Sequence, residues 1–134
     1  MNEIIFWFLV SLFATLIVTR ICAHKLHDRN GYRKENGDFI ESSKTLTAYL
    51  RKRTRKDLHH IHIGFGILLV AVPWIIHSGI GRMNIFFLGI GLSLVIDQLL
   101  PFFKFGNYFS KKMLRASIIL HLLIAILGII ILRY

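Results

Sequence analysis

Four long apolar stretches alternate with short or strongly polar segments along the chain. They cover about residues 4–21, 61–80, 84–103 and 113–132. Each is close to the roughly 20 residues that an α-helix needs to cross the hydrocarbon core of a bilayer. The pattern therefore predicts an all-α integral membrane protein, in which four transmembrane helices form a single membrane domain over residues 1–134.

The positively charged residues lie mainly in two of the three connections. The connection over residues 23–58 and the one before the fourth stretch hold fifteen of the 17 Lys and Arg, if Arg20 and Arg115 at their borders are included. Only Arg82 and Arg133 lie at the opposite ends of the stretches. The positive-inside rule places basic connections in the cytoplasm. We therefore expect a multi-pass protein of the plasma or inner membrane, with both termini on the non-cytoplasmic side.

The net charge of +10 follows largely from this distribution, and its densest run covers residues 51–56. Basic runs can bind nucleic acid, but beside a membrane-spanning stretch anionic lipid headgroups are the more fitting counter-charge. We expect membrane lipids as partners, with Arg51, Arg53 and Arg55 in contact with anionic headgroups. A nucleic-acid partner is not expected.

The long connection carries weaker signals for local structure. The dipeptide Asn36-Gly37 favours a small hairpin over residues 31–40. Ser42 or Ser43 is suited to cap a helix that continues toward the second apolar stretch. The basic connection is therefore predicted to contain some regular structure between the first and second helices.

Six of the seven histidines share one predicted depth near the cytoplasmic surface with Asp97, the only acidic residue of the membrane core. Asp97 lies four residues before Pro101, and His121 lies on the order of 10 Å inside the fourth stretch by helix rise. The other five border the long connection: His24, His27, His59, His60 and His62. Imidazole near neutral pH can titrate, transfer protons or bind metal, so this layer is the candidate site.

Small and polar residues recur every four positions in three of the stretches. These stripes are Ser11, Thr15 and Thr19; Gly89, Ser93 and Asp97; and Ser117, His121 and Ala125. Residues four apart share a helix face, and small or polar faces favour contact between membrane helices. We predict that all three stripes face the interior of the bundle. Close helix packing is also expected at the glycines Gly64, Gly66, Gly89 and Gly91.

Several imidazoles around a carboxylate suit a divalent metal such as Zn or Fe. The hypothesised ligands are His59, His60, His62 and His121, with His24 and His27 as outer members. Asp97 would be a further ligand or the catalytic base that takes a proton from bound water. This hypothesis predicts a metal-dependent enzyme acting on a lipid or a membrane-embedded substrate. The histidine spacing departs from the histidine boxes of membrane desaturases and hydroxylases, so membership of those families is not predicted.

Several alternatives use the same residues differently. Arg20 ends the first stretch at a similar depth and can form a structural ion pair with Asp97. Haem held by two histidines, for example His62 and His121, is another possibility. Asp97 and His121 can also form a gate or proton relay in a homo-oligomeric channel or transport subunit. A non-catalytic assembly or partner protein, with the basic connection as its contact surface, is the remaining class.

Overall fold

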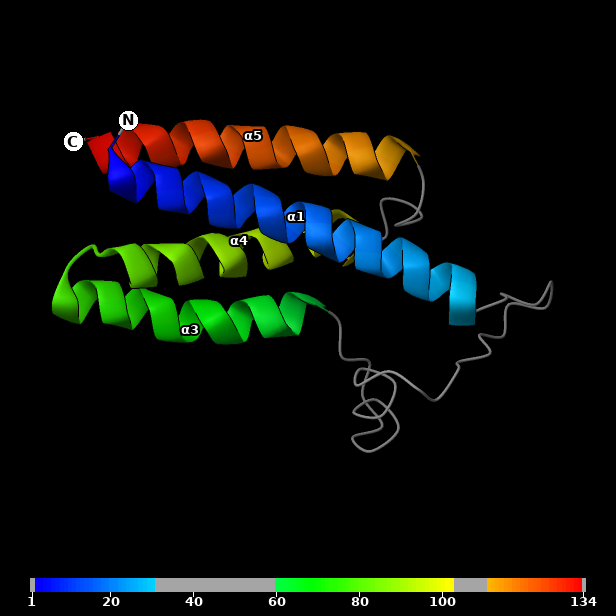
Figure 1. Cartoon of the computed structure of the whole chain (residues 1–134), viewed down its shortest axis with the longest axis horizontal. Helices are drawn as coiled ribbons and strands as arrows, with labels where there is room; N and C mark the ends of the chain where they lie inside the picture. The colour runs from blue at the N-terminus through cyan, green and yellow to red at the C-terminus, as the bar shows by residue number, and fades with distance from the viewer. Residues whose placement is uncertain (1, 31–59, 103–110, 134) are drawn as a thin grey trace.

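The computed structural model of the chain describes residues 2–30, 60–102 and 111–133, with side chains for all of these except residues 23–30, 60 and 100–102. These residues form four α-helices, which Figure 1 labels α1, α3, α4 and α5. Their bounds are α1 Glu3–Asn30, α3 His60–Ser78, α4 Arg82–Phe102 and α5 Lys111–Arg133. Each is long and apolar enough to cross a membrane. The all-helical fold and the four predicted spans are confirmed at this level.

The first helix is longer than predicted. The apolar pattern ends near residue 21, whereas α1 continues to Asn30. Residues 22–30 contain no Gly or Pro and include the helix-favouring Ala, Lys, Leu and Arg, and Gly31 follows directly. The predicted connection over residues 23–58 therefore begins as a continuation of α1. The predicted hairpin over residues 31–40 and the helix after Ser42 or Ser43 lie outside the described residues.

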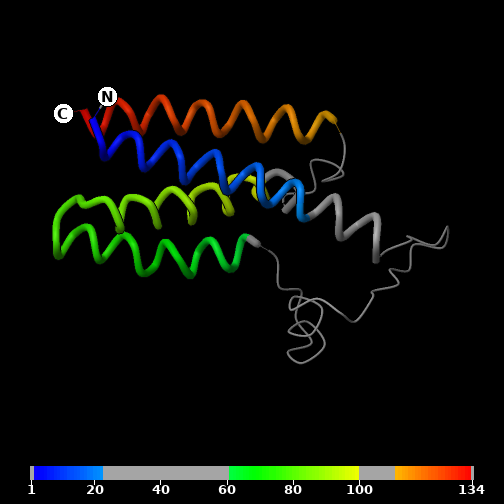
Figure 2. The backbone as a smooth tube through the Cα atoms, in the orientation of Figure 1, coloured from blue at the N-terminus to red at the C-terminus, as the bar shows by residue number. Residues whose placement is uncertain are grey.

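Helix α4 is the centre of the bundle, because it packs against each of the other three described helices. Helix α1 also packs against α5, whereas α3 packs only against α4 among the described helices. Figure 1 shows α5, α1, α4 and α3 in this order across the molecule. Both termini lie at the same end of the bundle as the turn between α3 and α4 (Figure 2). We call this the termini end, and the other end, where α3 and α5 begin, the connection end.

The turn between α3 and α4 is held by one asparagine side chain. The Gly81 backbone N–H donates to Asn84 Oδ1 over 2.8 Å, and Asn84 Nδ2 donates to the Gly79 carbonyl over 2.7 Å. Gly79 has a φ of 75° and donates its N–H to the Ile75 carbonyl, which ends α3 as glycines in this conformation commonly do. The two helices are thus joined as a tight antiparallel pair.

Glycines bring α4 close to its neighbours, as predicted, at three of the four expected positions. A side chain at Gly89 would collide with Ser11 of α1 and lie 3.0 Å from the Phe8 carbonyl. A side chain at Gly64 would lie 2.9 Å from the Gly91 carbonyl, where α3 crosses α4. The prediction is wrong for Gly66, which has no atom within 4 Å of the position of an added Cβ. Gly66 lies on a side of α3 that has no neighbouring helix there.

Candidate functional site

Two of the predicted stripes form the two sides of one helix–helix contact. Helices α4 and α5 run antiparallel, and the Ser117 hydroxyl donates to Asp97 Oδ1 over 2.8 Å. One turn nearer the termini end, Ser93 Oγ lies 3.0 Å from His121 Nε2. All four side chains are 2% exposed or less. The prediction that both stripes face the interior is confirmed, and the structure adds that they face each other.

Helix α1 completes the cluster with an ion pair. Arg20 Nε donates to Asp97 Oδ1 over 2.7 Å, and Arg20 Nη2 lies 2.6 Å from the same oxygen. Arg20 is 7% exposed and Asp97 2%. The structure therefore contains the ion pair that the sequence offered as the structural alternative for Asp97. We refer to Arg20, Ser93, Asp97, Ser117 and His121 as the polar cluster.

The hydrogen bonds of His121 identify its neutral tautomer. His121 Nδ1 lies 2.7 Å from the Ser117 carbonyl, and a carbonyl oxygen can only accept, so Nδ1 carries a proton. In the neutral ring Nε2 is then the acceptor, and the Ser93 hydroxyl donates to it. Ser117 connects the two ionisable groups of the cluster, because its carbonyl accepts from His121 while its hydroxyl donates to Asp97.

Toward the termini end the cluster is followed by apolar side chains. Phe8, Leu12 and Ile85 are at most 2% exposed and belong to the core shared by α1, α4 and α5. The buried Ser11 at this level donates its hydroxyl to the Phe8 carbonyl of its own helix. The third stripe is thus confirmed as buried at Ser11. Its other members, Thr15 and Thr19, are half-buried.

The predicted metal ligands are only partly within the described residues. His121 and Asp97 are linked through Ser117. His62 is exposed and lies on α3. In the part of the chain that the structure describes, no group of three or more His, Cys, Asp or Glu side chains is arranged to hold a metal ion. The side chains of His24, His27, His59 and His60 lie outside the described residues, as do Arg51, Arg53 and Arg55, so their assigned roles stay predictions.

Helix α3 meets α4 on a different face from the polar cluster. A side chain added at Gly64 of α3 would contact Gly91, Leu94 and Val95. Gly91 and Val95 are each two residues from Ser93, which is a rotation of about 200° around an α-helix, and Leu94 is rotated by about 100°. Among the described side chains, His62, Asp97 and His121 do not form a group that could hold a metal ion, and the haem pair of His62 and His121 stays a prediction.

Ser93 and Ser117 are the members of the cluster that the sequence did not nominate as site residues. Both lie on predicted stripes, four residues from an ionisable group, so that spacing was the available signal. Comparison of the chain with protein-family models, with curated proteins and with solved structures finds no match. The site must therefore be interpreted from its own chemistry.

Proposed function

We propose that this chain is an integral membrane protein with both termini on the non-cytoplasmic side. Large apolar side chains cover its outer surface, including Leu69 at 76% exposure and Ile76 at 80%. A protein surface in water rarely exposes such a continuous apolar area. Aromatic contacts join Trp7 with Phe86, and Trp74 with Phe87, in the half of the bundle nearer the termini end. Rings at this level suit an interface with lipid headgroups, and the charge distribution along the chain supports the orientation.

We further propose that the protein transfers protons in a membrane transport process, and that the polar cluster is its proton-binding site. The observation that carries this proposal is the buried chain of contacts from Arg20 through Asp97 and Ser117 to His121. Ionisable groups inside a membrane are costly and commonly mark paths for ions or protons. Replacement of a buried ion pair by apolar residues is often neutral or stabilising, so helix packing alone gives little reason for this cluster.

The tautomer of His121 determines how a proton enters. In the neutral state Nε2 holds the free electron pair and accepts from the Ser93 hydroxyl. An arriving proton binds to Nε2, and the Ser93 hydroxyl turns so that its oxygen becomes the acceptor. The Arg20–Asp97 pair is neutral as a unit, so the uptake gives the cluster one positive charge. Such a charge in an apolar interior is unfavourable and favours a rearrangement of α5 against α1 and α4.

The buried apolar side chains beyond the cluster favour a gated site over an open pore. Phe8, Leu12 and Ile85 fill the bundle between His121 and the termini end. A proton bound at His121 therefore needs a conformational change before it can leave toward that end. This arrangement supports gated proton transfer, in which helix movement and proton binding are linked.

The proposal is tested by proton uptake into vesicles that contain the purified protein and a pH-sensitive dye, with a potassium gradient and valinomycin to drive the protons. The matched variants are His121→Gln, which retains an amide donor and acceptor but cannot titrate, and His77→Gln, which changes an exposed histidine of α3. We expect vesicles with the wild type or His77→Gln to take up protons. Vesicles with His121→Gln should take up protons only as fast as empty vesicles do. Wild-type uptake equal to that of empty vesicles, or an unchanged rate in folded His121→Gln, would contradict the proposal.

A further inference from the structure

A close contact between α1 and α5 lies on the termini side of the polar cluster. A Cβ added at Gly128 of α5 would collide with the Phe8 ring of α1 and lie 2.8 Å from its Cζ atom. Phe8 is 2% exposed, and the two helices lie side by side along the bundle (Figure 1). The ring therefore fills the space that a side chain at Gly128 would need.

Gly128 lies on the same face of α5 as His121. Ala125 follows His121 by four residues, and Gly128 follows Ala125 by three. Such spacings keep residues on one helix face. The seven residues from His121 to Gly128 span about 10 Å along the helix axis, and α5 runs toward the termini end. The Phe8 ring therefore lies beyond the proton-binding site, on the side that a proton leaving toward this end must cross.

The backbone of Phe8 is held against α4, whereas its ring contacts α5. The Phe8 carbonyl lies only 3.0 Å from the position of an added Cβ at Gly89 of α4. Two ion pairs also join α1 to α4, one in the polar cluster and one at the termini end: Arg20–Asp97 and Glu3–Arg82. A movement of α5 therefore changes the surroundings of the Phe8 ring while the backbone of Phe8 keeps its place.

We propose that the Phe8 ring, seated against Gly128, is the gate that controls the passage of protons between His121 and the termini end. This inference rests on the proposed proton transfer. Among the described residues, the charged groups near His121 are Arg20 of α1 and Asp97 of α4. Protonation at His121 Nε2 gives this group one net positive charge, which favours movement of α5. Gly128 then moves away from the Phe8 ring, water reaches Nε2 and accepts the proton, and His121 returns to its neutral tautomer.

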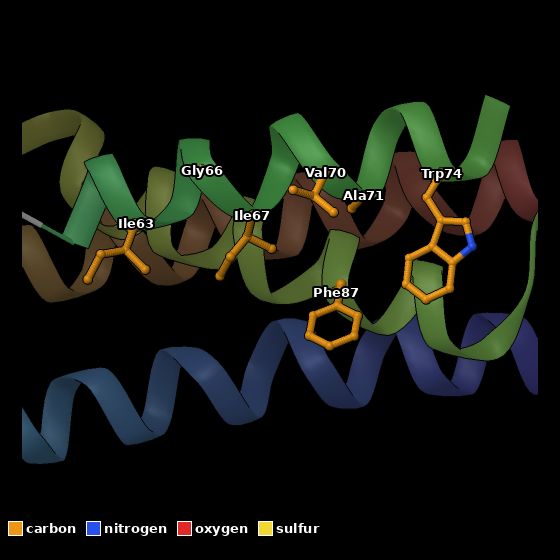
Figure 3. A pocket seen from close by; sticks show the side chains of 7 residues that line it. All are labelled: Ile63, Gly66, Ile67, Val70, Ala71, Trp74 and Phe87. Carbon is orange, nitrogen blue, oxygen red and sulfur yellow. The ribbon is translucent and has the colours of Figure 1, made fainter. Parts of the chain in front are cut away.

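The first test measures proton uptake by Phe8→Ala in the vesicles described above. We expect uptake at least about tenfold faster than in the wild type, because opening no longer breaks the packing of an aromatic ring. The matched control is Phe87→Ala, which removes the same ring from the apolar groove between α3 and α4 (Figure 3). No member of the polar cluster lines this groove, so the control should keep the wild-type rate. Circular dichroism verifies that both variants remain helical.

The double variant Phe8→Ala, His121→Gln shows whether the faster uptake uses the proton-binding site. We expect the rate of empty vesicles, because without His121 the open gate leads to no group that binds a proton. Faster uptake that persists in the double variant would mean that a hole runs through the bundle, and would overturn the gate. An unchanged rate in folded Phe8→Ala would overturn the gate alone, whereas absence of uptake by the wild type would contradict the proposed proton transfer itself.

A fluorine label on the ring tests the gate without a measurement of transport. A fluorinated phenylalanine incorporated at position 8 reports by NMR whether the surroundings of the ring change. We expect its resonance to shift reversibly as the pH falls in the otherwise wild-type protein, and to stay constant in His121→Gln. A resonance that is constant in both proteins, or that shifts equally in both, would overturn the gate.

Discussion

Arg20 and Asp97 are 77 residues apart in the chain, yet Arg20 Nη2 lies 2.6 Å from Asp97 Oδ1 in the interior of the bundle. The pair joins α1 to α4, and the Ser117 hydroxyl binds the same carboxylate oxygen from α5. One carboxylate therefore holds three helices together. Because both charges are buried, the energetic effect of a substitution depends on whether one partner or both are removed.

Removal of one partner should be more harmful than removal of both. Arg20→Met leaves the Asp97 carboxylate buried without its cation, and we expect it to lower the free energy of unfolding by about 3–5 kcal/mol. The double variant Arg20→Met, Asp97→Leu leaves no buried charge and should recover most of this loss. Reversible unfolding in mixed micelles measures both. A double variant whose loss equals the sum of the losses in Arg20→Met and in Asp97→Leu, each measured alone, would contradict the coupling of these residues.

Replacement of Gly89 and of Gly66 by alanine should change the stability of the protein in opposite directions. At Gly89 the added methyl group collides with Ser11 and the Phe8 carbonyl. We expect an overpacking cost of about 1–3 kcal/mol, which exceeds the gain of up to about 1 kcal/mol in helix propensity. At Gly66 only the gain applies, so Gly66→Ala should be neutral or stabilising. Unfolding in mixed micelles measures the change in the free energy of unfolding for each variant. A loss of stability in Gly66→Ala but not in Gly89→Ala would show that the helix contacts are wrong.

The sequence predicted the inward faces of the helices but not their neighbours. The four-residue spacing of Ser93 with Asp97, and of Ser117 with His121, was sufficient to show that each stripe is buried. Spacing defines a direction around one helix axis, whereas the identity of the facing helix depends on the packing of the whole bundle. For this reason the sequence offered the ion pair between Arg20 and Asp97 only as an alternative to the metal site.

Position along the axis of the bundle was likewise predictable, but position around α4 was not. The sequence placed His62 at a similar depth to Asp97, and a shared depth suggested a shared site. In the structure α3 packs on the face of α4 that carries Gly91, Leu94 and Val95, whereas Asp97 is bound by Arg20 of α1 and Ser117 of α5. The sequence also assigned Gly66 to close helix packing, because the residue type alone does not distinguish Gly66 from Gly64.

The orientation in the membrane can be tested with single cysteines. In a Cys22→Ala background, Ser78→Cys lies beside the turn between α3 and α4, and Lys112→Cys lies at the connection end; both native residues are exposed. We expect an impermeant maleimide to label Ser78→Cys in intact cells, because the basic connections are retained in the cytoplasm. Lys112→Cys should be labelled only after permeabilisation. The reverse result would require the opposite orientation.

We propose that His121 binds and releases a proton in the polar cluster. Nitrogen NMR of isotope-labelled histidine in bilayers tests this most directly. Subtraction of the His121→Gln spectrum isolates this one ring from the other histidines. We predict a ring protonated at Nδ1 and unprotonated at Nε2 at alkaline pH, which converts reversibly to a ring protonated at both nitrogens as the pH falls. A proton on Nε2 in the neutral ring, or a ring that stays neutral down to the pH at which the protein unfolds, would contradict it.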